Sequence, residues 1–180
     1  METKIIYFVH GTTTDNAAKL CSGWKQAMLN ELGTEQAKDL GNIIKEKEIE
    51  FDVIFTSDLK RAIDSSNIAF PGNTKVEDSR LRECNYGDLD GKHKSLVVYE
   101  EHINEKFPNG ECLKDVEKRM RDFIDSLKQN YSGKVIGIVA HRAPQLALEV
   151  ITKWLSWEEA IKNDWRNIGA WQPGWEYIIK

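Results

Sequence analysis

The sequence predicts an α/β fold, with a mainly parallel sheet between two layers of helices. Two observations carry this prediction. Apolar runs rich in β-branched residues recur along the 180 residues, and segments with helical spacing of apolar side chains separate them. Strands that alternate with helices favour βαβ units, and such units build a three-layer α/β/α sandwich of Rossmann-like topology. No repeat, low-complexity tract or linker divides the chain, so we expect residues 1–180 to form one domain.

Four segments have the patterns of strands. Three are continuous apolar runs, typical of strands buried on both faces, and they cover residues 4–9, 51–56 and 134–140. The fourth, "WEYIIK" at residues 175–180, follows a Pro-Gly turn.

Three segments have the patterns of helices, at residues 34–49, 57–70 and 112–130. Thr34 is the expected N-cap of the first, and Ser57 or Asp58 that of the second. The third carries six apolar residues at helical spacing that should face the core: Leu113, Val116, Met120, Phe123, Ile124 and Leu127.

Composition narrows the class of protein. A net charge of −4 and a pI of about 5.6 argue against a general nucleic-acid binder. No apolar run is long enough for a membrane span, and the N-terminus lacks the layout of a signal peptide. Three cysteines without CxxC spacing favour reduced thiols. We therefore expect a cytoplasmic protein, monomeric or homodimeric, whose partner is a small molecule and neither a nucleic acid nor a membrane.

Polar residues follow three of the predicted strands. The first strand ends at His10, the second leads into a helix whose first turn carries Arg61, and the run ending at residue 140 is followed by His141. In a parallel sheet, ligands bind outside the carboxyl ends of the strands. The sequence therefore predicts that these three side chains meet at one edge of the sheet.

Such a group of side chains predicts an anion pocket. Gly11 would let the backbone approach a ligand, Thr13 and Asn16 offer neutral donors, and Arg61 can bind two phosphoryl oxygens through its planar fork. A neutral imidazole such as His10 can attack phosphorus when an acceptor holds its other nitrogen. Taken singly, each residue is as well explained as an ordinary polar group.

A histidine nucleophile requires a proton donor for the leaving alkoxide. Glu83 lies in a loop-like stretch with two glycines, and a carboxyl beside a phosphate dianion tends to keep its proton because like charges repel. The alternative is a surface carboxylate paired with Arg80 or Arg82. Spacing alone favours that alternative.

Several blocks together resemble the histidine phosphatase superfamily, in its phosphoglycerate mutase-like branch, over nearly the whole chain. The blocks are "FVHGTTTDN", "CSGW", "LNELGTEQA", "TSDLKRAIDSS", "LRECNYGDLDGK" and "VAHRAP". The "CSGW" block is similar to a substrate-facing segment of the family, which implies that Ser22 and Gly23 contact the substrate. The resemblance also implies the phosphoglycerate mutase-like fold.

The resemblance implies a role for each residue of the predicted pocket. His10 would carry the phosphoryl group in a covalent intermediate, and Arg61 and His141 would bind that group and stabilise its transition-state charge. Glu83 would protonate the leaving oxygen and then activate water. The family uses neither a metal nor an organic cofactor for this reaction.

The sequence departs from the family at Val9, where the family has an arginine that binds phosphate. Loss of one charge-assisted donor costs about 3 kcal/mol of transition-state stabilisation, or roughly two orders of magnitude in rate. Arg142 is a candidate to compensate; equally, it could face solvent or pair with an acidic neighbour. Reduced activity is therefore expected, and Val9→Arg is expected to raise kcat/KM by about ten- to a hundredfold.

The sequence thus predicts a phosphomonoesterase that hydrolyses small phosphate esters through a phosphohistidine. One alternative is a catalytically impaired protein of the same fold that binds phospho-ligands or regulates. Another is a phosphoglycerate mutase, although the chain is short and only residues 93–110 could act as a lid. Nothing in the sequence distinguishes a sugar phosphate from a nucleotide or phosphoglycerate.

Overall fold

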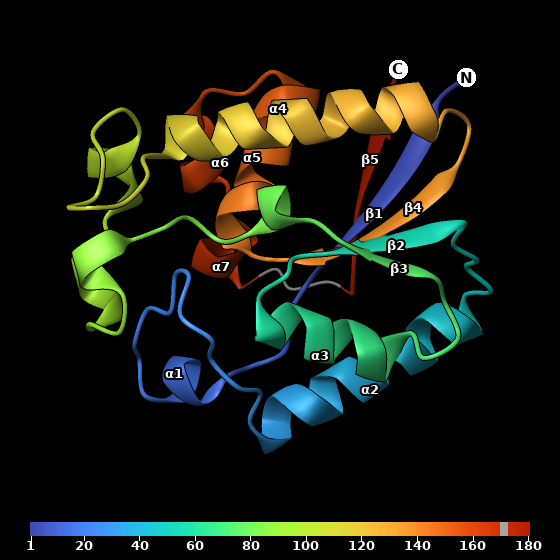
Figure 1. The fold of residues 1–180 in the computed structure, drawn as a ribbon, viewed down its shortest axis with the longest axis horizontal. Helices are drawn as coiled ribbons and strands as arrows, with labels where there is room; N and C mark the ends of the chain where they lie inside the picture. Colours follow the sequence, from blue (N-terminus) through green and yellow to red (C-terminus); the bar gives the residue numbers. More distant parts are fainter. Residues whose placement is uncertain (170–172) are drawn as a thin grey trace.

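The structure is a computed structural model that describes residues 1–169 and 173–180 and has the predicted α/β/α architecture (Figure 1). Its sheet has the strand order β3-β2-β4-β1-β5. The strands are β1 (Thr3–Val9), β2 (Val53–Thr56), β3 (Lys75–Glu77), β4 (Val135–Ala140) and β5 (Trp175–Ile179). Neighbouring strands from β3 to β1 pair in parallel, whereas β5 pairs antiparallel to β1, so the sheet is mixed and mainly parallel.

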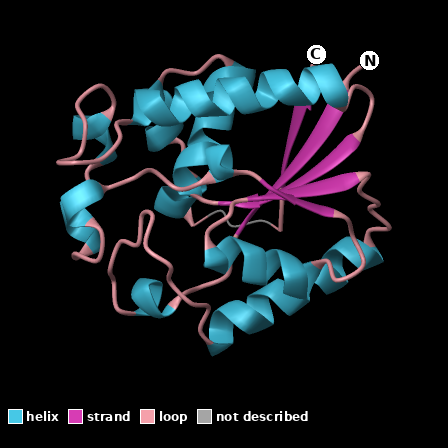
Figure 2. Ribbon diagram, viewed as in Figure 1, coloured by secondary structure: helices cyan, strands magenta, loops and turns pink. Residues whose placement is uncertain are grey.

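Helices cover both faces of the sheet (Figure 2). One face carries α2 (Glu31–Glu46) and α3 (Lys60–Ala69), and the other carries α4 (Leu113–Asn130), α5 (Arg142–Lys153) and α6 (Trp157–Lys162). The short helices are α1 (Thr14–Ala17), α7 (Trp165–Ile168) and the 3₁₀ turns η1 (Ser79–Leu81), η2 (Gly87–Leu89), η3 (Lys94–Leu96) and η4 (Tyr99–His102). None of the helices among the described residues is long and apolar enough to cross a membrane.

The alternation of side chains along β1 explains the two layers of core. Ile5 and Tyr7 point into the larger apolar cluster, together with the six predicted residues of α4, which are all buried. Ile6 and Phe8 point into the smaller cluster on the α2 and α3 side. Because β1 is covered on both faces, its sequence is apolar at nearly every position.

The first predicted helix begins earlier than expected, so the prediction of Thr34 as its N-cap is wrong. Asn30 caps α2 instead, and its side-chain oxygen accepts a hydrogen bond from the Gly33 amide at 2.8 Å. The Thr34 hydroxyl donates back to the Asn30 carbonyl within the first turn. An asparagine can cap as well as a threonine, and here it lies four residues earlier.

The predicted caps of the second helix are also wrong. Leu59 occupies the N-cap position of α3, without a side-chain cap. The Ser57 hydroxyl lies 2.8 Å from Nε2 of His141, and Asp58 forms an ion pair with Arg82 at 2.6 Å. Asp58 therefore takes a long-range partner in place of the helix end. Ser57 combines its long-range partner with a local hydrogen bond, accepted from the Leu59 amide at 3.3 Å.

The sequence did not predict β3. This strand has only three residues, lies at the edge of the sheet beside β2, and is largely exposed. A segment this short and polar carries no apolar run, so only its pairing with β2 makes it a strand.

Candidate active site

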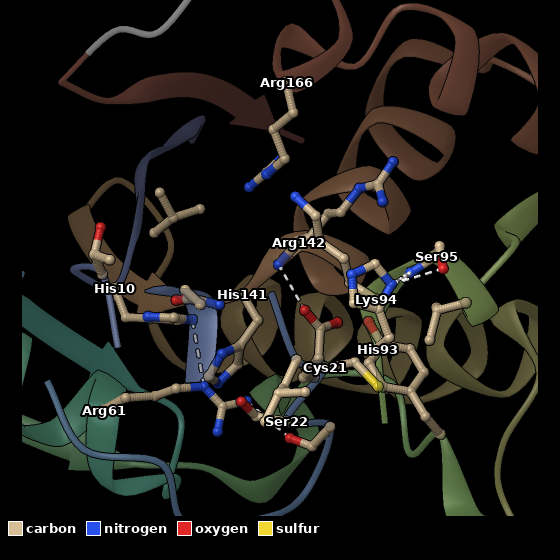
Figure 3. A pocket seen from close by; sticks show the side chains of 18 of the residues that line it. His10, Cys21, Ser22, Arg61, His93, Lys94, Ser95, His141, Arg142 and Arg166 are labelled. Atoms are coloured by element: carbon tan, nitrogen blue, oxygen red, sulfur yellow. Dashed lines mark hydrogen bonds between the residues drawn. The ribbon is translucent and has the colours of Figure 1, made fainter. Parts of the chain in front are cut away.

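A cavity of about 640 Å³ opens at the carboxyl ends of β1, β2 and β4 (Figure 3). Its wall includes all the predicted site residues except Gly11 and Thr13: His10, Asn16, Ser22, Gly23, Arg61, Glu83, His141 and Arg142. Figure 3 shows His10, Arg61 and His141 pointing toward one another, as expected from their places after three strands.

His10 is held in one tautomer. Its Nδ1 lies 2.7 Å from the Gly11 carbonyl, and its Nε2 lies 3.3 Å from Nε of Arg61. A carbonyl accepts and a guanidinium donates, so the proton is on Nδ1 and the lone pair of Nε2 accepts from Arg61. Burial, and next the charge of Arg61, lower the pKa of His10 to about 3. The ring is therefore neutral and oriented, as a nucleophile requires.

Arg61 is fixed by the backbone of a neighbouring loop. Its side chain is almost fully buried, with 2% exposed, and it donates to the carbonyls of Gly23 and Lys25 at 2.8 and 2.9 Å. Burial lowers the pKa of Arg61 from its usual range. These contacts hold the guanidinium against His10, where it can bind a phosphoryl group on Nε2.

His141 directly follows β4 and lies beside the nucleophile. Its ring centre is 5.0 Å from that of His10, and its Nε2 lies 2.8 Å from the Ser57 hydroxyl. Burial, and next the charge of Arg61, hold the pKa of His141 well below its usual range. Its Nδ1 is buried and has no hydrogen-bond partner among the residues described. His141 is therefore neutral and has one ring nitrogen available for a ligand.

Glu83 is buried and does not pair with either nearby arginine, so the surface alternative is wrong. Arg80 bonds to Asp78 and Arg82 to Asp58, both at 2.6 Å. These aspartates take the two arginines, and the Glu83 side chain turns inward with 8% of the residue exposed.

The N-terminus of α5 receives the Glu83 carboxyl. Oε1 accepts from the amides of Cys84 and Ala143, both at 2.9 Å, and lies 3.5 Å from the Tyr99 hydroxyl. Oε2 accepts from the Arg142 amide at 3.1 Å. Oε2 thus has fewer donors than Oε1 and is the better placed oxygen to exchange a proton with a ligand.

The remaining residues of the first motif shape the backbone around His10. Thr13 and Asn16 cap α1 reciprocally, through two side-chain-to-amide bonds of 3.0 and 3.1 Å. Asn16 lines the cavity, while Thr13 is fully buried. A Cβ on Gly11 would collide with the Gly33 carbonyl, so glycine allows the strand end to approach α2. The roles of Thr13 and Asn16 as ligand donors stay predictions.

Arg142 lines the cavity, but it is paired with an acidic residue. Its Nε lies 2.7 Å from Oδ2 of Asp164, and its guanidinium carbon lies 4.4 Å from the ring centre of Tyr99. These contacts raise the pKa of Arg142 against the effect of burial. Its contact with phosphate stays a prediction.

The cavity wall contains further cationic and polar residues that the sequence did not indicate as site residues. His93, Lys94 and Ser95 come from the predicted lid segment, and Arg166 comes from α7 (Figure 3). The sequence predicts residues 93–110 as a lid but does not indicate which of them contact the cavity. No sequence pattern distinguishes Arg166 from other arginines, because α7 has only four residues.

Within residues 1–169 and 173–180, no group of three or more His, Cys, Asp or Glu side chains could hold a metal ion. The polar groups in the cavity wall include the neutral imidazoles of His10 and His141, several cations and the Glu83 carboxyl. Such a set is suited to an anionic ligand.

Two imidazoles and a buried arginine around one cavity, with a carboxyl opposite, define a phosphate-handling site on an α/β/α fold. Residues 6–168 match the Histidine phosphatase superfamily (branch 1), and the chain belongs to this family.

Curated relatives include phosphoglycerate mutases. The 2,3-bisphosphoglycerate-dependent phosphoglycerate mutase of Bifidobacterium longum is 30% identical over 202 aligned positions, covering 90% of this chain and 82% of that protein. The enzyme of the same name from Streptococcus uberis is 46% identical over 97 positions. That match spans 51% of this chain and only 42% of the mutase.

Solved structures confirm the fold. A mycobacterial glucosyl-3-phosphoglycerate phosphatase has a TM-score of 0.79 at 24% identity, covering 87% of this chain and 85% of its own. Bacillus stearothermophilus YhfR has a TM-score of 0.77 at 26% identity, with coverage of 88% and 83%. The phosphoglycerate mutase of Bacillus anthracis has a TM-score of 0.72 at 21% identity, with coverage of 85% and 81%.

Proposed function

We propose that this protein is a phosphomonoesterase that hydrolyses small phosphate esters through a phosphohistidine on His10. One observation carries the proposal. Nε2 of His10, a residue of the cavity wall, is unprotonated and accepts a hydrogen bond from Nε of Arg61 at 3.3 Å. A phosphoryl group bound there would meet a nucleophile and a buried cation at once.

The first step forms the phosphoenzyme. The Nε2 lone pair of His10 forms a bond to phosphorus while the bond from phosphorus to the ester oxygen breaks. Arg61 and His141 donate hydrogen bonds to the phosphoryl oxygens as charge moves onto them. Glu83, acting as general acid, gives a proton from Oε2 to the leaving oxygen.

The second step releases phosphate. The carboxylate of Glu83 takes a proton from water, and the water oxygen bonds to phosphorus while the bond to Nε2 breaks. The electron pair returns to His10, and Glu83 is again protonated. The hydrogen bond from Nδ1 to the Gly11 carbonyl keeps the ring in place through both steps.

The departure at Val9 supports a second candidate, an impaired phospho-ligand-binding protein of the same fold. Val9 lines the cavity and offers the ligand no donor. A binding protein would take up phosphate esters at this site without forming the phosphoenzyme.

A phosphoglycerate mutase is the third candidate, favoured by the names of the curated relatives. A mutase and the proposed phosphatase differ in the fate of the phosphoryl group. A mutase returns it to glycerate, whereas a phosphatase gives it to water.

The test is a panel of phosphomonoesters with purified protein, in which released phosphate and moved phosphate are measured separately. We expect phosphate release, an acid-labile phosphoryl group on the protein in quenched reactions, and neither with His10→Ala. Exchange between glycerate positions without release would favour the mutase. Binding of phosphate with no turnover of any ester would favour the impaired protein.

A further inference from the structure

We propose that Arg166 supplies the phosphate-binding guanidinium that the position before His10 lacks. It would bind the same phosphoryl group as Arg61, from the opposite side of the cavity. The inference rests on the proposed function, because it assumes that a phosphoryl group lies beside His10.

Helix α7 lies over the end of β1, where Val9 and His10 are located. Trp165 of this helix shares with Val9 and His10 a small cavity of about 180 Å³ that adjoins the main one. Its indole stacks on Trp175 at 5.2 Å between ring centres, and this contact joins α7 to β5. The next residue, Arg166, reaches the wall of the main cavity.

The side chain of Arg166 extends toward His10 and His141 (Figure 3). Among the residues described, its guanidinium bonds to other side chains through Nη1 only, with Asp164 at 2.9 Å and Gln145 at 3.2 Å. The planar face lies 4.4 Å from the ring centre of Trp165. These contacts orient the group and leave the donors on Nε and Nη2 for a ligand.

Asp164 is the anchor of this arrangement. Its side chain is fully buried, caps α7 by accepting the Arg166 amide at 3.1 Å, and binds guanidinium groups through both oxygens. Oδ1 holds Arg166 and Oδ2 holds Arg142. One buried carboxylate thus fixes two cations, which offset its charge.

Arg166 is better placed than Arg142 to replace the missing arginine. The guanidinium of Arg142 lies against Tyr99, on the side of the cavity that holds Glu83. Arg166, by contrast, shares the cavity wall with Val9 and His10 and extends toward His10, and its charge is among the causes that lower the pKa of His10. With Arg61 on one side and Arg166 on the other, a phosphoryl group on His10 would meet two cations despite Val9.

The test measures binding of inorganic phosphate and of orthovanadate by titration calorimetry, which requires no turnover. We expect Arg166→Gln to weaken phosphate binding by about ten- to a hundredfold, the effect of one charge-assisted hydrogen-bond pair. Arg166→Lys should lose part of the affinity, because it keeps the charge without the fork. The matched control is Arg121→Gln, an arginine bound to Glu117 on α4, which should bind phosphate as the parent does.

A double-mutant cycle of Val9→Arg and Arg166→Gln tests whether an arginine at position 9 can do the work of Arg166 in binding phosphate. Val9→Arg should restore most of the affinity that Arg166→Gln loses. In the parent it should change phosphate affinity by less than about threefold, in place of the large gain expected from the sequence, because Arg166 already fills the place. The inference is overturned if Arg166→Gln, in folded protein, binds phosphate within twofold of the parent. It is overturned also if Val9→Arg strengthens binding tenfold in the parent. A parent that binds phosphate through Arg166 but turns over no ester would support this inference and refute the proposed activity.

Discussion

The floor and the rim of the cavity are held in different ways. The floor consists of His10, Arg61, Glu83 and His141, and the rim of Lys94, Ser95, Arg142 and Arg166. Backbone groups fix three floor residues: carbonyls hold His10 and Arg61, and amides hold Glu83. Side chains hold the two rim arginines, chiefly through Asp164.

This difference suggests a division of roles, in which the floor residues carry out the reaction and the rim residues select the ester. Backbone groups move only with the main chain, so the floor keeps a geometry that the proposed reaction needs for every ester. The rim depends on contacts between side chains, which a few substitutions can change without altering the fold. Changes in the floor should therefore lower kcat, and changes in the rim should raise KM, except at Arg166, which we propose to bind the reacting phosphoryl group and whose loss should change both.

The largest effect is expected for His10→Ala, which removes the nucleophile from the floor. Activity should fall by at least about ten-thousandfold, because no other group can form the covalent intermediate. The half-buried ring leaves no large cavity in the core, so the melting temperature should stay within a few degrees. Steady-state hydrolysis of p-nitrophenyl phosphate checks the first expectation and calorimetry the second.

The matched control for this variant is His102→Ala, at a half-buried histidine of η4 outside the cavity wall. It should hydrolyse the ester at the parent's rate. A His10→Ala protein that retained the parent's activity would remove the phosphohistidine from the mechanism.

The second largest effect is expected for Glu83→Gln. Esters with alkyl leaving groups should lose about a hundred- to ten-thousandfold in kcat, because their oxygens need a proton as they leave. p-Nitrophenyl phosphate, whose leaving group is stable as an anion, should lose less than about tenfold in the first step. Rapid-quench kinetics of phosphoenzyme formation with both substrates checks this contrast.

Glu101→Gln, at an exposed position of η4, is the control for the loss of one carboxylate. Equal losses for the alkyl and the aryl ester in Glu83→Gln would contradict a role as general acid. Glu83 would then act by holding the N-terminus of α5 in place.

Most of the floor could be predicted from the sequence because chain order fixes its place. His10 and His141 follow continuous apolar runs, and Arg61 lies in the first turn of the helix after a third run. Parallel strands bring such ends to one edge whatever the details of packing. The five-stranded architecture was predictable for the same reason, except for the short edge strand β3.

The ion pairs between residues far apart in the chain could not be predicted from the sequence. Spacing favours an ion pair between Glu83 and Arg82, yet Arg82 pairs with Asp58, which lies 24 residues earlier in the chain. Arg166 gave no signal at all, because its place above β1 depends on α7 stacking against β5. Charged side chains on turns find partners that only the assembled fold supplies.

A smaller effect is expected for Lys94→Ala, which removes a cation from the rim. Lys94 is exposed and lines the cavity wall, so it acts on an anionic ester through a screened charge. KM should rise by about three- to tenfold with kcat unchanged within twofold, and the difference should shrink at high salt. Initial rates at low and at high sodium chloride check both expectations.

Lys118→Ala removes an exposed lysine from α4, away from the cavity, and is the control. A fall in kcat for Lys94→Ala with KM unchanged would contradict the division between floor and rim. It would indicate that Lys94 acts on the reacting group itself.

The smallest effect concerns stability, and it tests the neutral state of the floor histidines. The pKa of His10 is lowered to about 3 and that of His141 well below its usual range, against about 6.5 in an unfolded chain. Below about pH 6.5 the unfolded state therefore binds protons that the folded state does not. The free energy of unfolding should consequently fall as the pH decreases from about 6.5 to 4.5, by at most about 1.4 kcal/mol per pH unit for each histidine.

Urea titrations of the parent and of His10→Gln at several pH values between 4.5 and 7.5 measure this dependence. Glutamine keeps a polar side chain at the strand end and cannot take the proton, so the slope between pH 4.5 and 6.5 should decrease by up to one proton. The remaining slope combines His141 with Asp90, whose carboxyl pKa is raised by burial to about 6 and which therefore contributes with the opposite sign. Carboxylates with lowered pKa values, such as Asp164, lose their contribution only at lower pH. Equal slopes in the two proteins would mean that His10 titrates alike in the folded and unfolded chain, and Nε2 would then be protonated in much of the folded protein at mildly acidic pH.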